Sequence, residues 1–148
     1  MKVVVDTNMV VYLRDRRSPV HPRARSALAY AAKAGDGITL VPQVIYELWA
    51  VLTRSIEKNG LGWAPARAEA AIRDLLVSLP LTPDSADLVS NWLTAVARSA
   101  ITGKRSHDWR LAVAARLAGA NAILTFNTSD LAGFEGLEIL EPAVDRAG

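Results

Sequence analysis

A run of three valines, Val3 to Val5, leads directly into Asp6, Thr7 and Asn8 near the start of the chain. Consecutive β-branched side chains are typical of a strand that is buried on both faces, as in a parallel sheet. Thr7 and Asn8 are helix-capping residues, so a helix is expected directly after the strand. Asp6 then stands at the carboxyl end of a strand, where open α/β sheets place their ligands. Asp6 alone is equally well explained as a helix cap, so a functional interpretation requires other carboxylates at the same edge.

Strand and helix patterns alternate along the rest of the chain, which predicts an α/β fold with a parallel sheet covered by helices on both faces. Further strands are expected at 38–41, 122–125 and 137–140, and a short edge strand at 79–82, where Pro80 is tolerated. Helices are expected after Thr7 and over the segments 22–34, 42–58, 64–78, 83–100 and 106–118. The central sheet would then have about four to five strands, and residues 1–148 would form a single domain.

The 148 residues include no cysteine. This excludes a disulfide framework and a zinc site with cysteine ligands, and it fits a reducing compartment. The first residues are too few and too acidic for a signal peptide, and no apolar run approaches the roughly 20 residues that span a bilayer. We therefore expect a cytoplasmic protein without a membrane segment.

The charges are unevenly distributed, although the net charge is only +2. Residues 1–35 contain seven Lys or Arg and two Asp, whereas residues 127–148 contain five acidic residues and Arg146 as the single cation. Thirteen of the 17 cationic residues are arginines, whose guanidinium group matches phosphate with two donors. This distribution is compatible with a polyanionic partner, and also with a basic face that is merely solvated.

Glu47 is the second carboxylate of interest. The expected helix 42–58 has an apolar stripe at Val41, Val44, Ile45, Leu48, Val51 and Leu52. Glu47 lies beside or within that stripe, since it follows Val44 by three residues and precedes Val51 by four. A carboxylate that faces a core is costly unless it is paired or bound to metal, and an apolar residue would suit the stripe better than an unpaired one. The alternatives are a glutamate that reaches water at the stripe's margin or one that pairs with an arginine.

A third acidic residue, Asp108, ends the segment Gly103-Lys104-Arg105-Ser106-His107-Asp108 at an expected helix start. Leu111, Ala112 and Ala115 share the face of Asp108. An acidic residue in the first turn often serves only as a partner of the helix dipole. Asp108 differs from a solvent-exposed cap because it heads a face that points into the protein.

Asn127 and Asp130 follow the expected strand 122–125 and therefore also stand at a carboxyl strand end. Turn formation is the simpler explanation for both, and for Asp130 alone it is the favoured one. Parallel strands send their carboxyl ends to one edge, however, so Asp6, Glu47, Asp108 and Asn127 are compatible with one shared pocket. Several oxygen ligands without histidine or cysteine favour Mg²⁺ or Mn²⁺ over zinc.

The segments Asp6-Thr7-Asn8, Glu47 within a helix, 103–108 and 124–131, in this order and spacing, resemble the PIN-domain family. The resemblance runs from Val3 to about Pro142 and is greatest for the VapC-type toxins of toxin–antitoxin pairs. It implies an α/β PIN domain and the activity of a metal-dependent endoribonuclease. The implied cofactor is Mg²⁺ or Mn²⁺, and the implied substrate is RNA.

By this resemblance Asp6, Glu47 and Asp108 match the acidic metal-binding and catalytic positions of the family. The fourth position, often Asp in the family, falls on Asn127. A neutral amide binds a cation less strongly than a carboxylate, so Asp130 is expected to compensate as a metal ligand. Thr7 matches a hydroxyl position beside the first aspartate.

Lys104 and Arg105 flank Asp108 and are expected, with Thr7, to bind substrate, because cations there can hold RNA phosphates. His107 is expected to be a surface residue. Trp49, Trp63, Trp92 and Trp109 can stack on bases, but core or interface packing is the more common role of tryptophan.

The resemblance also implies partners, namely a cognate antitoxin protein and a second copy of the chain in a homodimer. An apolar helical-hairpin surface at Trp49, Val51, Leu52, Leu61 and Trp63 would lie near these contacts. Two other functions remain open. One is a non-toxin PIN nuclease of RNA processing, and the other is a degenerate, non-enzymatic RNA-binding module, which the Asn127 substitution would favour.

Overall fold

Four parallel strands form the centre of the fold, in the order β2-β1-β3-β4. The computed structural model describes residues 1–143, so Asp145 and Arg146 of the charged C-terminal stretch lie outside the described residues. The strands are β1 (Lys2–Val5), β2 (Gly37–Thr39), β3 (Ala122–Leu124) and β4 (Glu138–Leu140). The valine run of β1 lies between β2 and β3, with Val3 opposite Ile38 and Ala122. This central position explains why every side chain from Val3 to Val5 is buried.

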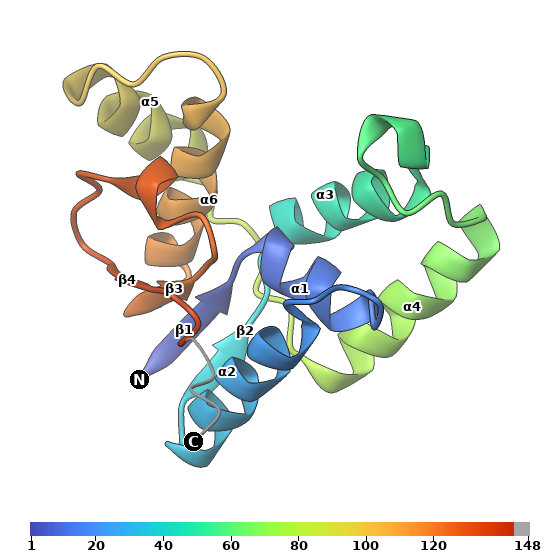
Figure 1. Cartoon of the computed structure of the whole chain (residues 1–148). Helices are drawn as coiled ribbons and strands as arrows, with labels where there is room; N and C mark the ends of the chain where they lie inside the picture. Colours follow the sequence, from blue (N-terminus) through green and yellow to red (C-terminus); the bar gives the residue numbers. More distant parts are fainter. Residues whose placement is uncertain (144–148) are drawn as a thin grey trace.

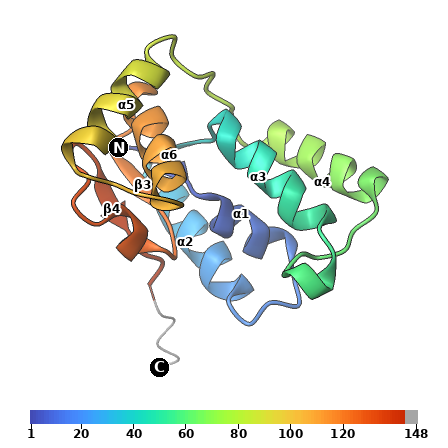
Figure 2. The ribbon, with the colours of Figure 1, turned by 90° about the horizontal axis from the view of Figure 1, so that it is seen from above.

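Helices cover both faces of this sheet, as the alternating pattern predicts (Figures 1 and 2). The helices are α1 (Thr7–Arg14), α2 (His21–Lys33), α3 (Pro42–Thr53), α4 (Pro65–Ser78), α5 (Leu88–Arg98) and α6 (Arg105–Leu117), with short 3₁₀ turns η1 (Ile56–Lys58) and η2 (Thr128–Leu131). Helices α1 and α2 lie on one face, and α6 lies on the other with α5 packed against it. Helices α3 and α4 form a hairpin that packs on α1 and projects beyond the sheet.

The alanine content of α6 lets it approach the sheet closely. Ala112 and Ala115 are completely buried, and Leu111 is nearly so. These residues occupy the inward face predicted from the sequence, with Asp108 at its start. No helix within residues 1–143 combines the length and apolar character needed to cross a bilayer.

The predicted strand 79–82 is reduced to one parallel bridge between Leu40 and Leu81. Pro80 has no N–H to donate, so only its carbonyl takes part, accepting a hydrogen bond from Leu40 N at 2.8 Å. The sheet therefore has four strands, at the lower end of the predicted number.

Two predicted helices are shorter than the sequence pattern indicated. Helix α3 ends at Thr53 rather than at residue 58, because the chain turns back sharply there. A Cβ atom on Gly60 would lie 2.0 Å from the carbonyl oxygen of Arg54, so only glycine fits this turn. Helix α5 begins at Leu88 rather than at 83, after a turn in which the backbone N–H of Asp87 donates to Ser85 Oγ at 3.1 Å.

Candidate active site

Asp6 is fixed where the carboxyl ends of β1 and β3 meet. The Thr125 hydroxyl, at the end of β3, donates to Asp6 Oδ2 at 2.7 Å. The backbone N–H of Thr7 donates to Asp6 Oδ1 at 2.6 Å, so Asp6 also caps α1. The two interpretations of Asp6 drawn from the sequence are therefore compatible, since one residue caps the helix and stands at the edge of the sheet.

Asn8 connects the segment after β3 to the same place. Its Nδ2 donates to Thr125 Oγ1 at 3.2 Å, and its Oδ1 accepts from the backbone N–H of Phe126 at 3.2 Å. The Thr125 hydroxyl also accepts from the backbone N–H of Asn127 at 3.0 Å. These bonds hold the start of the loop that carries Asn127 and Asp130 against the end of β1.

Glu47 reaches this edge from α3. The Thr7 hydroxyl donates to Glu47 Oε2 at 2.7 Å, and Gln43 Nε2 donates to Glu47 Oε1 at 2.6 Å. Glu47 is half-buried beside the fully buried Val44 and Leu48, so the expected place beside the apolar stripe is confirmed.

Gln43 links this carboxylate to α6. Its Nε2 also donates to the carbonyl oxygen of His107 at 2.9 Å, and its Oε1 accepts from Arg110 Nε at 2.7 Å. Within residues 1–143 no arginine forms an ion pair with Glu47, so the pairing considered from the sequence is not found, and Arg110 bonds to Gln43 instead. The network joins α1, α3 and α6 around Glu47.

The pKa values show that the acidic side chains share one electrostatic environment. Burial raises the pKa of Asp6, and the negative charges of Glu47 and Asp130 raise it further, against the lowering effect of hydrogen bonds from Thr125 and Thr7. Burial raises the pKa of Asp108 to about 6, with further contributions from the charges of Asp130, Asp6 and Glu47. The four carboxylates therefore repel one another, as expected of acids gathered at one place.

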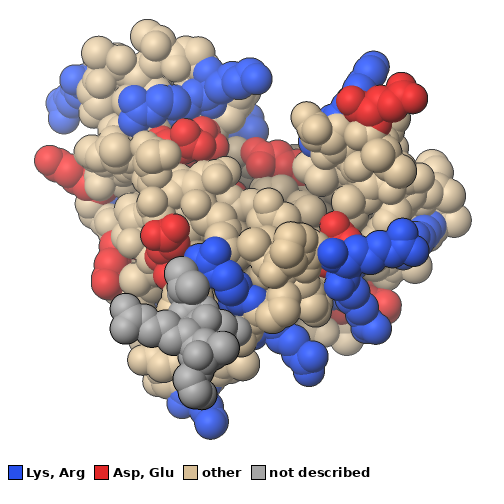
Figure 3. Space-filling model, viewed as in Figure 1, with Lys and Arg blue, Asp and Glu red and all other residues tan. Residues whose placement is uncertain are grey.

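A cleft of about 350 Å³ opens between these residues. Its lining includes Asp6, Thr7, Glu47, Asp108 and Asn127. Figure 3 shows acidic side chains in the hollow between the part of the molecule that carries α5 and α6 and the part that carries α3. The structure thus brings together predicted site residues from four separate stretches of the chain, whereas Asp130, Lys104 and Arg105 do not line this cleft.

Oxygen donors dominate this cleft, and this chemistry suits Mg²⁺ or Mn²⁺. The mutual repulsion of the carboxylates also favours a cation between them. Within residues 1–143, however, no three acidic or imidazole side chains are close enough to coordinate one ion as they stand. The donor set fits a hard divalent cation, and its side chains would have to converge further to hold one.

The two cations predicted to flank the site have different surroundings. Lys104 is exposed. Arg105 is half-buried and donates to the carbonyl oxygens of Asp130 and Ala132, at 3.5 and 3.2 Å. Arg105 therefore attaches η2, the turn that carries Asp130, to the start of α6. His107 is exposed, as expected, and lies in a separate cavity with Tyr46.

Two residues of this network, Thr125 and Gln43, were not identified from the sequence. Thr125 is completely buried and bonds to residues almost 120 positions away, so no local pattern marks it. Gln43 had a weak signal, since it precedes Glu47 by four residues and therefore shares its face of α3.

Two of the four tryptophans, Trp92 and Trp109, have a clear role in packing or hydrogen bonding. Trp109 is buried in the core, and Trp92 Nε1 donates to the carbonyl oxygen of Ser106 at 2.8 Å. Trp49 is exposed and Trp63 is half-buried. Leu52, expected on the hairpin surface, is instead completely buried, because α3 packs on both α1 and α4.

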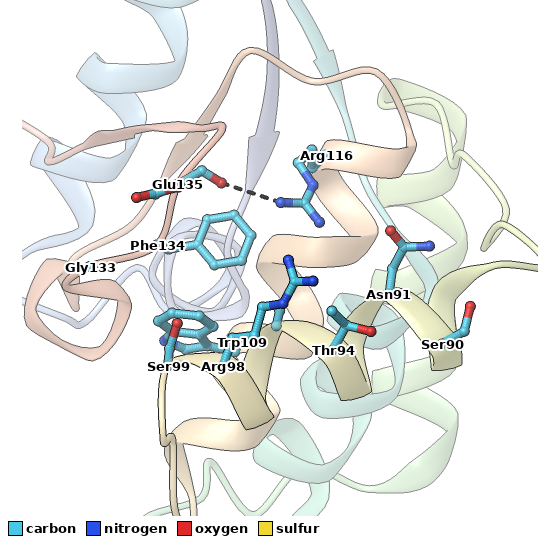
Figure 4. Close-up of a pocket in the computed structure, with 11 residues that line it drawn as sticks. Ser90, Asn91, Thr94, Arg98, Ser99, Trp109, Arg116, Gly133, Phe134 and Glu135 are labelled. Carbon is cyan, nitrogen blue, oxygen red and sulfur yellow. Dashed lines mark hydrogen bonds between the residues drawn. The ribbon is translucent and has the colours of Figure 1, made fainter.

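A second cavity, of about 550 Å³, lies between α5, α6 and the loop before β4 (Figure 4). Arg98 and Arg116 line it, and Arg116 donates to the carbonyl oxygen of Glu135 at 3.4 Å. The Arg116 guanidinium also lies 5.4 Å from the centre of the Phe134 ring. None of the sequence-predicted site residues lines this cavity.

The chain is an α/β domain with a four-stranded parallel sheet and acidic side chains at its carboxyl edge, and comparisons with known proteins identify its family. The sequence matches the family described as "PIN domain" over residues 3–135. The chain therefore belongs to the PIN domain family, as the motifs predicted. A comparison with curated protein sequences found no match.

Similar solved structures include two DNA-bound VapBC complexes and a VapC toxin. VapBC2 from Rickettsia felis, bound to a DNA fragment from its promoter, has a TM-score of 0.70 at 19% identity, covering 95% of this chain and 98% of that chain. DNA-bound VapBC from Salmonella typhimurium has a TM-score of 0.70 at 16% identity, covering 97% and 99%. VapC20 from Mycobacterium tuberculosis, a Sarcin-Ricin loop cleaving toxin, has a TM-score of 0.60 at 16% identity, covering 91% and 98%. At these identities the likeness concerns the fold.

Proposed function

We propose that this chain is a metal-dependent endoribonuclease and the toxin of a VapBC-type toxin–antitoxin pair. The observation that carries the proposal is the gathering of Asp6, Glu47, Asp108 and Asp130 at the carboxyl edge of a PIN-domain sheet. The fold of solved VapBC complexes, matched over almost the whole chain, supports the toxin assignment.

In this proposal Asp6, Glu47 and Asp108 of the cleft would hold Mg²⁺ or Mn²⁺, with Asp130 close by and Asn127 at the cleft wall. The chemistry supplied by a bound divalent cation is the activation of water and the stabilisation of negative charge on the scissile phosphate. Thr7 holds Glu47 in place through its hydroxyl group. Thr125 does the same for Asp6, and its hydrogen bond lowers the pKa of Asp6, which favours the ionised form that binds a cation.

The substrate proposed is RNA, with its phosphates near Lys104 and Arg105 at the start of α6. Lys104 is exposed and able to contact a phosphate. Arg105 acts in this proposal both on RNA and on the position of Asp130, since its guanidinium group holds η2.

A homodimer and a cognate antitoxin complete the proposal. Large apolar side chains are exposed on two helices, Tyr46 of α3 at 72% and Val89 and Leu93 of α5 at 71% and 58%. Such residues are candidates for the contact between two copies. A Val89→Asp substitution is expected to shift the sedimentation coefficient toward that of a monomer, and an unchanged coefficient would remove α5 from the contact.

The deciding experiment compares RNA cleavage by the purified wild type, Asp6→Asn and Asp108→Asn, with Mg²⁺, Mn²⁺ or EDTA. The wild type should cleave RNA only with metal, and the two active-site variants should not cleave it. Asp74→Asn, which changes an exposed aspartate of α4, is the control and should behave as the wild type. Both active-site variants should remain folded, because removing one charge from an acidic cluster relieves repulsion. Full activity of either variant would contradict the proposed role of that residue.

Toxin function is tested separately by induced expression, followed by mapping of the new 5′ ends in cellular RNA. Growth arrest that depends on Asp6 and is relieved by the product of an adjacent small gene would support a toxin. Cleavage without growth arrest would favour a nuclease of RNA processing. RNA binding without cleavage would indicate a degenerate site.

A further inference from the structure

A groove rich in arginine lies beside the candidate active site. The loop after α1 forms one wall, and the segment between η1 and α4 forms the other. Its volume is about 610 Å³, and its lining residues include Arg14, Arg16, Arg17, Trp63 and Arg67. Figure 3 shows Lys and Arg side chains gathered over the end of α1 and the loop that follows it.

The positive charge of this groove is only partly balanced, because its lining has four arginines and one acid, Asp15. Within residues 1–143, no carboxylate oxygen lies within 4.0 Å of any of the four guanidinium groups. The Nε of Arg14 is buried and has no hydrogen-bond partner among these residues. An unpaired buried donor is costly, so an acceptor supplied by a ligand would stabilise this wall.

Trp63 and Arg67 give the groove a flat surface as well as charge. The Arg67 guanidinium lies 3.8 Å from the centre of the Trp63 ring. Stacking of this kind orders a guanidinium group and leaves its outer face available to a planar ligand. Nucleic-acid bases stack on such aromatic and guanidinium surfaces.

The groove adjoins the acidic cleft. Asp15 and Leu61 line both cavities. A phosphodiester chain at the cleft faces several carboxylates that repel it, so its neighbouring phosphates need cations close by. Arg14, Arg16, Arg17 and Arg67 are arranged along the next cavity to meet this need.

We propose that this arginine groove binds the backbone of single-stranded RNA on one side of the scissile phosphate, an inference that rests on the proposed RNase function. Guanidinium pairs with phosphate account for affinity, and the Arg67–Trp63 stack supports one base. An acidic protein segment is the competing occupant. RNA is favoured because the groove adjoins the site where cleavage is proposed.

The test is fluorescence anisotropy of a labelled single-stranded RNA of about 12 nucleotides, a length in the range of single-strand binding sites. It is carried out in EDTA, so that binding is measured apart from cleavage. The groove variant combines Arg16→Ala, Arg17→Ala and Arg67→Ala. The matched control combines Arg25→Ala, Lys33→Ala and Arg73→Ala, which are exposed cations of α2 and α4 outside the groove. Circular dichroism verifies that both variants are folded.

The groove variant is expected to bind RNA about tenfold to hundredfold more weakly near 0.1 M salt, with a salt slope reduced by up to about two units, because three phosphate contacts are lost. The control should bind as the wild type does. Equal binding by the groove variant and the control would overturn the inference. A groove variant that binds RNA as the wild type does but no longer binds the antitoxin would also overturn the inference. The groove would then be a contact with that protein. If the wild type cleaves no RNA yet binds it through the groove, the RNase proposal fails, and only the part of the inference that concerns RNA binding by the groove stands.

Discussion

The hydroxyl group of Thr7 donates a hydrogen bond of 2.7 Å to Glu47 Oε2, which ties the end of β1 to α3 across the candidate active site. The two residues are 40 positions apart in the chain. Thr7 is buried, so this bond is sheltered from water. It sets the position of a carboxylate that would otherwise be free to turn toward solvent, and this dependence is testable.

Thr7→Val removes the hydroxyl while preserving the shape of the side chain. The free energy of unfolding is expected to fall by about 0.5–1.5 kcal/mol, the usual contribution of one hydrogen bond. The rate of RNA cleavage should fall by a larger factor than this loss of stability alone would cause, because Glu47 loses its orientation. Thr7→Ser retains the donor and should restore both, as measured by chemical denaturation and cleavage rate. Failure of serine to rescue cleavage would indicate that the methyl group matters instead.

Glu47→Leu tests whether the carboxylate is a structural partner. The apolar stripe alone favours leucine, but in the structure the Thr7 hydroxyl and the Gln43 amide both donate to Glu47. Leucine would leave these donors without an acceptor, so the variant should unfold more easily, by about 1–3 kcal/mol. Glu47→Gln retains an acceptor and should be nearly as stable as the wild type, though inactive. Increased stability of the leucine variant in thermal denaturation would contradict this expectation.

Asn127→Asp adds a carboxylate to the wall of the cleft. Divalent metal affinity should increase, since a carboxylate binds a hard cation more strongly than an amide does. Isothermal titration with Mn²⁺ measures the change, and Asn121→Asp, an exposed position outside the cleft, is the control. Unchanged affinity would indicate that Asp130 already supplies the ligand.

The raised pKa of Asp108, about 6, predicts a pH dependence of stability without metal. Between the ordinary value of 3.8 and about 6, the folded chain binds more protons at this carboxyl than the unfolded chain does. The stability contributed by this group is therefore fully present below pH 3.8 and is lost as the pH rises through about 6. Asp108→Asn should gain stability relative to the wild type over this range, as followed by denaturation in EDTA. A difference that does not change with pH would show that the carboxyl titrates normally.

Lys104→Ala and Arg105→Ala should have different effects, although the residues are adjacent. Lys104→Ala should weaken RNA binding and reduce the salt slope by about 0.7 units for a single strand, with no loss of stability. Arg105→Ala should in addition destabilise η2, because its guanidinium bonds to two carbonyl oxygens there. Cleavage-site preference should stay the same in both, since phosphate contacts carry no sequence information. Identical profiles in binding and thermal denaturation would contradict this division.

Much of the fold was predictable because local patterns specify it. The valine run identified the central strand β1, and the alternation of strands and helices identified a parallel α/β sheet. The inward face of α6 followed from the spacing of its apolar residues. Errors arose where a turn overrode the pattern, as at Gly60, where the close approach to Arg54 ends α3 early.

The sequence by itself also determined which oxygen-bearing side chains lie at one edge of the sheet, through the positions of Asp6, Glu47, Asp108 and Asn127 relative to the elements. Only the tertiary structure decided how they are held. Thr125 and Gln43 act through hydrogen bonds to residues far away in the chain, and the arginine groove forms where the loop after α1 meets the segment before α4. Periodicity specifies which face of an element is apolar, but the contacts between distant faces depend on how all the elements pack at once.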